Sequence, residues 1–269
     1  MATPFEFRNL CHKEAYTQHT SGVLSGHVQA NLLILPREAA KDFTNLCERN
    51  PVPCPLLAKT RESPNILDDN GKLVFKGEFD IRTNFPRYNI YENGEIVEQK
   101  LNCIDEWTND HIGFLIGCSF SFEAALIKSG LPPKNFVQGC NVSMYKTTKF
   151  LDAAGIFQKC PYVVSMRPYK PENLEEVRKI TGRFKKTHGE PIDWGFDGAK
   201  RLGIKDLSKP DYGDSVTIDR DEIPVFWACG VTPQLAVSTV GEKITGKVIG
   251  HVPGHMLVLD AIDDIFKSV

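Results

Sequence analysis

A buried strand that runs through a cysteine-bearing turn directly into a helix is the feature of this sequence that most constrains its fold, because it occurs twice. In HIGFLIGCSFSFEAALIKSGLPP, an apolar strand over 112–116 meets a turn at Gly117 and Cys118, and a helix follows. EIPVFWACGVTPQLAV repeats the pattern, with a strand over 223–228 and a turn at Cys229. Buried strands that lead into helices are typical of α/β proteins, so we predict that fold class.

The two turns also indicate a binding site. Ligands of open α/β sheets bind beyond the carboxyl ends of the strands, where helix N-termini present free N–H groups to anions. We therefore expect Cys118 and Cys229 to lie at carboxyl ends of strands in one sheet and to face a shared cleft. A helix N-terminus also stabilises a thiolate, which would lower the pKa of Cys118 to about 7. The alternative is that both thiols are buried and pack as small apolar side chains.

The helix after each cysteine supplies further candidate groups. In the second helix, Thr232 is placed to cap the N-terminus and Pro233 suits the first position. The N–H groups that follow Cys229 could stabilise an oxyanion. The candidate substrate-binding residues in these two segments are Ser119, Ser121, Gly230, Thr232 and Gln234.

The central third of the chain has a different pattern of predicted strands and helices. NVSMYKTTKF and YVVSMRPY read as strands, and a helix begins at Pro171 with acidic residues first and basic residues last. These elements do not alternate as βαβ units. We therefore predict a smaller two-layer α+β domain over residues 135–218, inserted into a main α/β domain formed by 1–134 and 219–269. In the main domain we expect a strand over 31–35, a helix over 38–49 and hairpin turns at Asn70-Gly71 and Asn93-Gly94.

Composition excludes several classes of protein. The chain has 32 basic and 34 acidic residues and a formal net charge of -2, which gives no electrostatic footprint for nucleic acid. No apolar run approaches the ~20 residues that span a bilayer, so we expect no membrane partner. Its eight cysteines form no Cys-x-x-Cys pair, and the N-terminus lacks a signal-peptide pattern. These features predict a cytoplasmic protein with reduced thiols, with the mitochondrial matrix as an alternative, and they are compatible with a homo-oligomer.

Two histidines in KVIGHVPGHMLVLD are candidate acid/base groups. His251 and His255 have the spacing of a zinc-binding pair, but this requires a shared helix face. Pro253 and Gly254 lie between them and disfavour a helix, so we predict no bound metal and no cofactor. The two imidazoles are instead suited to general acid/base catalysis. Each could alternatively hold loop backbone by hydrogen bonding.

Three charged residues complete the candidate site. Arg82 and Arg167 end predicted strands, and an arginine fork matches a carboxylate bidentately, so either could hold a substrate carboxylate. Asp214, in the loop PDYGDSV, could act as a base, although Gly-Asp is also ordinary turn chemistry.

Eight segments of the sequence are long and uncommon enough to identify a family. They are HVQANLLILP (27–36), NPVPCPLL (50–57), DIRTNFPRY (80–88), FLIGCSFSFEAAL (114–126), NVSMYKT (141–147), VVSMRPY (163–169), PVFWACGVTPQ (224–234) and HVPGHMLVLD (251–260). Through them the sequence as a whole resembles the D-glutamate cyclase family, whose bacterial members are usually called hydro-lyases. Small departures are Ser143, where proline is expected, and Val252, where alanine is usual. The resemblance implies elimination of water, with D-glutamate cyclising to 5-oxo-D-proline, and a three-layer α/β domain carrying a smaller two-layer domain.

Such a reaction needs a clamped α-carboxylate, a neutral amine and a protonated leaving oxygen. Arg82 or Arg167 could form the clamp, His251 or His255 could move the protons, and Cys118 could be a nucleophile or a hydrogen-bond donor. Two thiols on opposite faces of a substrate also suit a cofactor-independent amino-acid racemase. A third alternative is a non-catalytic protein that binds a small carboxylic acid.

Overall fold

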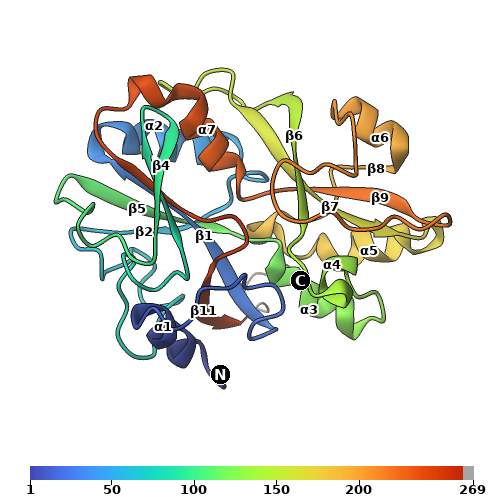
Figure 1. Cartoon of the computed structure of the whole chain (residues 1–269), viewed down its shortest axis with the longest axis horizontal. Coiled ribbons are helices and arrows are strands. Elements are labelled where there is room, and N and C mark those ends of the chain that lie inside the picture. Colours follow the sequence, from blue (N-terminus) through green and yellow to red (C-terminus); the bar gives the residue numbers. More distant parts are fainter. Residues whose placement is uncertain (263–269) are drawn as a thin grey trace.

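The computed structural model describes residues 1–262, which form two antiparallel sheets lying side by side (Figure 1). The first sheet occupies one half of the molecule and the second sheet the other half. Helices pack against both sheets, and the predicted α/β class is confirmed. Within the described residues, no helix is both long enough and apolar enough to cross a membrane.

The larger sheet has seven strands in the order β2-β5-β1-β10-β3-β4, with β11 pairing with β1 as well. All of its strand pairs are antiparallel. The Asn93-Gly94 hairpin joins β3 to β4 as predicted, whereas Asn70-Gly71 forms a turn without flanking strands. The strands are β1 (His27–Pro36), β2 (Leu56–Lys59), β3 (Tyr88–Glu92), β4 (Glu95–Lys100), β5 (His111–Gly117), β10 (Val248–His251) and β11 (Leu257–Ile262).

The smaller sheet has the order β6-β7-β9-β8. It contains β6 (Ser143–Phe150), β7 (Pro161–Tyr169), β8 (Asp193–Trp194) and β9 (Ile223–Ala228). β9 lies beyond the expected boundary at residue 218, yet it pairs along its whole length with β7. Sheet pairing thus places β9 with the smaller unit, because six consecutive residues of each strand are in register.

The helices are mostly short. The predicted helix 38–49 is α2, which begins one residue earlier, whereas the predicted helix after Pro171 is shorter than expected and ends before Gly182. The α-helices are α1 (Pro4–His12), α2 (Arg37–Arg49), α3 (Phe120–Lys128), α4 (Lys134–Gln138), α5 (Leu174–Thr181), α6 (Gly195–Arg201) and α7 (Thr232–Val240). Short 3-10 helices are η1 (Pro171–Asn173), η2 (Lys185–Thr187) and η3 (Gly241–Lys243).

Strand β1 is almost continuously apolar because both faces of the larger sheet are covered. Leu33 and Leu35 point into a core that includes residues of α2 and α7. Leu32 and Ile34 point into a second core, which is closed mainly by the irregular segment between β2 and β3. A strand buried on both faces loses the alternating pattern of a half-exposed strand.

The two strand–cysteine–helix junctions connect the halves of the molecule in opposite directions. Strand β5 belongs to the larger sheet, but α3 after it places Phe122 and Leu126 in a core with Trp227 of the smaller sheet. Strand β9 belongs to the smaller sheet, but α7 after it places Val237 in the core of the larger sheet. Each junction is therefore a crossover, and the two cysteines lie where the chain passes between the halves.

Candidate active site

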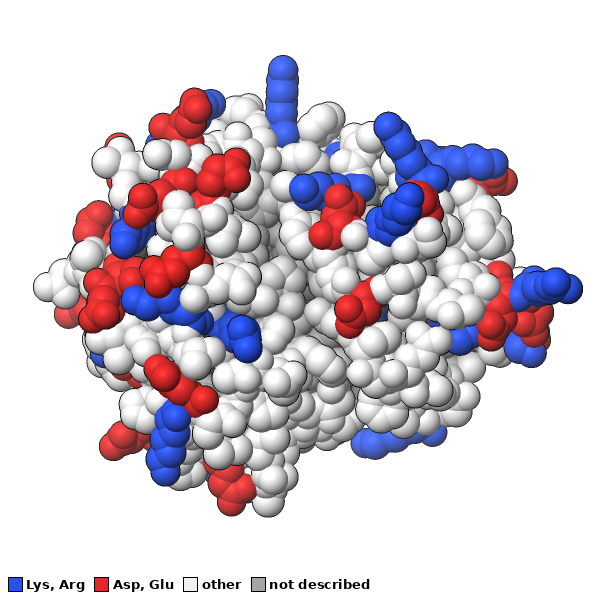
Figure 2. All heavy atoms as spheres, in the orientation of Figure 1, with Lys and Arg blue, Asp and Glu red and all other residues white. Residues whose placement is uncertain are grey.

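A small cavity lies between the two sheets, at the two crossovers. Its volume is about 10 Å³, which is close to the space that a single water molecule needs. The space-filling view shows that the band between the halves carries few charged residues, most of which lie toward the periphery (Figure 2). The cavity is lined by Asn31, Cys118, Ser119, Phe120, Asn141, Val142, Met144, Cys229, Gly230, Val231, Gly254 and Met256.

Cys118 and Cys229 share this cavity but not a sheet. The expectation that both lie in one sheet is wrong, because β5 pairs with β1 and β2 while β9 pairs with β7 and β8. The shared pocket instead arises because β5 of the larger sheet and β9 of the smaller sheet both end beside the cavity. The cysteines therefore approach the cavity from opposite halves.

The turn at Cys118 is fixed by backbone hydrogen bonds. The Cys118 N–H donates to the Gln29 carbonyl at 3.1 Å, and the Phe120 N–H donates to the Cys118 sulfur at 3.5 Å. Asn31 Nδ2 donates to the Gly117 carbonyl at 2.9 Å, which ties the end of β5 to β1. These bonds hold the thiol at the wall of the cavity.

The turn at Cys229 follows the same plan in the other half. The Cys229 N–H donates to the Val163 carbonyl of β7 at 3.1 Å. Thr232 does not cap α7 with its side chain, as had been predicted. Its hydroxyl instead accepts from the Val163 N–H at 3.0 Å, so it fastens the start of α7 to β7.

The residue after each cysteine has a free backbone donor. Within residues 1–262, the N–H groups of Ser119 and Gly230 have no hydrogen-bond acceptor, and both residues line the cavity. Such donors, at the start of a helix, suit a carboxylate or a developing oxyanion. One donor comes from each half of the molecule.

The predicted low pKa of Cys118 is not supported by its surroundings. Burial raises the pKa of the Cys118 thiol well above its usual value, and the hydrogen bond from Phe120 offsets only part of this. Burial also raises the pKa of Cys229, to about 11. The free energy lost when a thiolate is removed from water is larger than the stabilisation that a helix N-terminus provides, so both thiols are neutral near pH 7.

Arg167 lies behind Ser119 rather than in the cavity. Its side chain is fully buried, and its Nη2 lies 2.7 Å from Glu123 Oε1 in an ion pair. The same Nη2 donates to the Ser119 hydroxyl at 3.1 Å, and the guanidinium also packs against the rings of Phe122 and Trp227. The structure does not place Arg167 as a free carboxylate clamp, because its charge is already matched by Glu123.

Arg82 and Asp214 are also engaged elsewhere. Arg82 forms a bidentate pair with Asp80, with nitrogen–oxygen distances of 2.7 and 2.9 Å, and does not line the cavity. Asp214 is exposed, and its Oδ2 accepts from the Asn141 N–H at 2.8 Å. Asp214 thus supports a residue that lines the cavity but is not itself among the lining residues.

His251 is a core residue rather than an exposed acid/base group. It is fully buried, and its Nδ1 accepts from the Leu32 N–H at 3.1 Å and from Gln234 Nε2 at 2.8 Å. Tyr91 in turn donates to Gln234 Oε1 at 2.9 Å. Burial lowers the pKa of His251 to about 3, so the ring is neutral. His251 and Gln234 tie α7 to β10 and β1.

His255 and Ser121 have supporting positions beside the cavity. The His255 Nδ1 lies 3.1 Å from the Pro253 carbonyl, in the loop whose Gly254 and Met256 line the cavity. Burial lowers the pKa of His255 as well. The Ser121 hydroxyl accepts from the Gln29 N–H at 3.0 Å. Neither side chain is among the lining residues.

Two asparagines that sequence analysis overlooked line the cavity. Asn31 lies in the apolar run of β1, and this buried polar residue in a strand was a signal that could have been used. Asn141 lies two residues before the start of β6, and its side chain packs against Gly254. Among the described residues, no group of three or more His, Cys, Asp or Glu side chains could hold a metal ion.

Comparison with known proteins gives the family. The D-glutamate cyclase family model matches residues 112–260, which contain both cysteine junctions. A Schizosaccharomyces pombe protein that carries a hydro-lyase name is 45% identical over 96% of this chain and 84% of its own length. Similarly named proteins of Bordetella pertussis (47% identity, 92% of this chain and 85% of the relative) and Geobacillus kaustophilus (43%, 96% and 94%) also match.

Among solved structures, a nitrogen repressor-like protein of Methanococcus jannaschii aligns over 91% of this chain and 90% of its own, with 13% identity and a TM-score of 0.36. The sequence relatives cover nearly the whole chain at high identity. On this evidence the chain belongs to the D-glutamate cyclase family.

Proposed function

We propose that this protein catalyses the cyclisation of D-glutamate to 5-oxo-D-proline and water. The reaction class, a carbon–oxygen lyase that eliminates water, is that of the family to which the chain belongs. The observation that carries the proposal is the convergence of Cys118-Ser119 and Cys229-Gly230, one pair from each half, on a single cavity.

The free N–H groups at these turns suit the two carboxylates of the substrate. One junction would hold the α-carboxylate and the other the γ-carboxylate, which folds the chain back on itself. The amide groups of Asn31 and Asn141 are close enough to the cavity to fix the remaining polar atoms. The site thus binds a diacid through backbone dipoles and neutral side chains, without a free arginine.

In the reaction, the bond between the α-nitrogen and the γ-carboxyl carbon forms and a carbon–oxygen bond of that carboxyl breaks. The substrate ammonium supplies both protons that leave with the oxygen as water. A neutral thiol can relay them by donating to the departing oxygen and regaining a proton from nitrogen. Cys229 is the better relay, because its pKa is raised to about 11 and that of Cys118 is raised further.

The cavity is too small for glutamate in this structure. A space of about 10 Å³ holds roughly one water, so the two halves must separate slightly before an amino diacid can enter. Closure around the substrate would then exclude bulk water, which favours a dehydration. The proposed cycle therefore includes opening at the two crossovers.

A racemase is the second candidate, because the two thiols reach the cavity from opposite halves. The test is to incubate purified protein with D-glutamate, L-glutamate or D-aspartate in deuterated buffer and follow mass and chirality. We expect 5-oxo-D-proline from D-glutamate alone, since cyclising D-aspartate would give a strained four-membered ring. Deuterium at Cα with loss of chirality would support the racemase, and thermal stabilisation without product would support a binding protein.

A further inference from the structure

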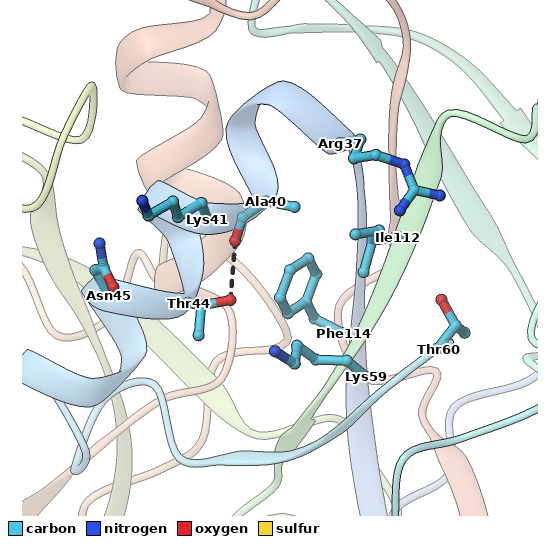
Figure 3. A pocket seen from close by; sticks show the side chains of 9 residues that line it. All are labelled: Arg37, Ala40, Lys41, Thr44, Asn45, Lys59, Thr60, Ile112 and Phe114. Carbon is cyan, nitrogen blue, oxygen red and sulfur yellow. Dashed lines mark hydrogen bonds between the residues drawn. The ribbon is translucent and has the colours of Figure 1, made fainter. Parts of the chain in front are cut away.

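A second, larger pocket lies between α2 and the strands β2 and β5, outside the proposed active site. Its volume is about 390 Å³, within the range of small-molecule sites. Figure 3 shows Phe114 between Thr44 of α2 and Ile112 of β5, with Lys59 below the ring and Arg37 at the opposite end of the pocket, beyond Ile112. The lining residues are Arg37, Ala40, Lys41, Thr44, Asn45, Lys59, Thr60, Ile112 and Phe114.

The charges in this pocket are all of one sign. Arg37, Lys41 and Lys59 are its charged lining residues, and none of them forms an ion pair with a carboxylate within residues 1–262. Among the residues that the structure describes, the Arg37 Nη2 donates only to the Asn109 carbonyl, at 3.2 Å. Three cations that line one pocket repel one another unless an anion lies among them.

Two other pockets of the same molecule provide the contrast. The pocket beside α4 contains Lys134, which lies within 2.6 Å of both Asp219 Oδ2 and Glu222 Oε2. The pocket beside η3 is lined by Lys243 together with Glu38 and Asp42. Cations in these pockets have acidic neighbours, in a chain that is slightly acidic as a whole. The cluster at α2 departs from this pattern.

The floor of the pocket is apolar. Ala40 and Phe114 are buried, and Ile112 packs against the same core, so the cations surround a hydrophobic surface. The Thr44 hydroxyl already donates its hydrogen to the Ala40 carbonyl at 2.9 Å and is not free to donate to a ligand. An inorganic anion would match the cations but leave this floor uncovered.

We propose that this pocket is a binding site for a small organic anion, in which a phosphate or carboxylate group is joined to an apolar body. Arg37 and Lys59 hold the anionic group, and the body lies over Ile112 and Phe114. Phe114 lies within β5 and four residues before Cys118, which follows the end of that strand, or roughly 13 Å along an extended chain. The site is thus separate from the cavity at the crossovers.

Titration calorimetry with phenyl phosphate, benzoate, inorganic phosphate and phenol tests this proposal. We expect both aryl anions to bind, and phenyl phosphate to bind more tightly because it carries more charge. Inorganic phosphate lacks the apolar body and phenol lacks the charge, so both should bind at least about tenfold more weakly. The affinity for phenyl phosphate should fall as salt rises from low to physiological concentration.

Variants locate the site. Arg37→Gln and Lys59→Gln should each weaken phenyl phosphate binding by about fivefold, the scale of a single partly exposed charge contact. Lys243→Gln is the matched control, because it removes a lysine from a pocket that already contains acidic residues, and should leave binding unchanged. Equal affinity in wild type and both pocket variants would overturn the proposal, as would equal binding of inorganic phosphate and phenyl phosphate.

Discussion

The two junctions have the same order of strand, cysteine and helix, but what lies behind each cysteine differs. Behind Cys118 is a buried charge pair, in which Arg167 contacts both Glu123 and Ser119. Behind Cys229 the contacts are neutral, with Thr232 bonded to the backbone of β7 and Gly230 packed against Asn31. One local pattern has therefore been built into two different environments.

This difference separates the roles that the two thiols can have. Burial dominates at both sites, and the positive charge of Arg167 lowers both pKa values by a smaller amount. Cys118 is the weaker acid of the two, partly because Glu123 lies near it. We infer that the Cys118 junction is a rigid, hydrogen-bonding wall and that Cys229 is the thiol able to exchange a proton.

The largest effect is expected from breaking the charge pair. Arg167→Met leaves the buried Glu123 carboxylate without its cationic partner, which should lower the free energy of unfolding by about 3–5 kcal/mol. Urea denaturation measures this. The double variant Arg167→Met/Glu123→Leu should recover most of the stability, because an apolar pair replaces the buried charges.

Turnover distinguishes a positioning role from a structural one. The double variant still lacks the hydrogen bond to Ser119, so its kcat should stay below that of wild type even where the fold is restored. A loss below 1 kcal/mol in Arg167→Met would show that the charge pair does not distinguish the two junctions.

Acid unfolding is the next largest effect, because each junction also has a buried histidine. His188 follows the residues that pack against Gly117, and its Nδ1 lies 2.8 Å from the Val52 carbonyl. His251 contacts Gln234 of α7. Burial lowers the pKa of His188 to about 4 and that of His251 to about 3. As pH falls below about 6.5, these histidines bind protons in the unfolded protein but stay neutral in the folded protein. The free energy of unfolding is therefore highest above pH 6.5 and decreases between pH 6.5 and pH 4.

The loss should be on the order of 3 kcal/mol for each histidine. His188→Gln and His251→Gln, measured by urea unfolding at several pH values, should each flatten the curve between pH 6.5 and 4. An unchanged slope in His188→Gln would mean that the histidine behind Cys118 is not buried in its neutral form.

Serine replacement compares the thiols directly. If Cys229 relays the proton, Cys229→Ser should lower kcat by about 10²-fold, the lower range for losing a positioned acid/base group. Cys118→Ser should lower kcat only about tenfold, because a hydroxyl can still donate a hydrogen bond. Cys160 is a buried control outside the cavity, and Cys160→Ser should keep near-normal turnover with D-glutamate. A larger loss in Cys118→Ser would reverse the two assignments.

The local elements of both junctions could be predicted from the sequence. The strand over 223–228 and the hairpin at Asn93-Gly94 are correct because apolar runs and turn residues act over a few positions. Which sheet each strand joins could not be predicted, since β1 pairs with β5, β10 and β11, far away in the chain. The expectation that Cys118 and Cys229 follow strands of one sheet was wrong because strand pairing depends on contacts between distant parts of the chain.

The residues at the cavity could also be predicted only where short-range sequence patterns determine their positions. Cys118, Ser119, Cys229 and Gly230 line the cavity, as residues at turns after buried strands often do. Arg167 looked available because its partner, Glu123, is 44 positions away. The low thiol pKa was wrong because a helix N-terminus is visible in the sequence, whereas the depth of burial is not.

The smallest effects come from the two glycines at the junctions. A Cβ at Gly117 would collide with the Lys186 carbonyl, whereas a Cβ at Gly230 would collide with the side-chain amide of Asn31. Overpacking of this kind costs about 1–3 kcal/mol. The backbone carbonyl of Lys186 cannot rotate away, whereas the Asn31 side chain can, so we expect a loss near the upper end of this range for Gly117→Ala and near the lower end for Gly230→Ala. Thermal or urea unfolding measures both losses.

Activity should rank the two glycine variants differently from stability. Displacing Asn31 in Gly230→Ala also disturbs its bond to the Gly117 carbonyl, so one substitution perturbs both junctions and the wall of the cavity. We expect its kcat to fall by more than its modest loss of stability would suggest. Asn31→Ala/Gly230→Ala relieves the collision but still lacks the Asn31 bond to the Gly117 carbonyl, so it should restore neither stability nor turnover to the wild-type level. If the double variant recovers both, Asn31 only fills space between the halves.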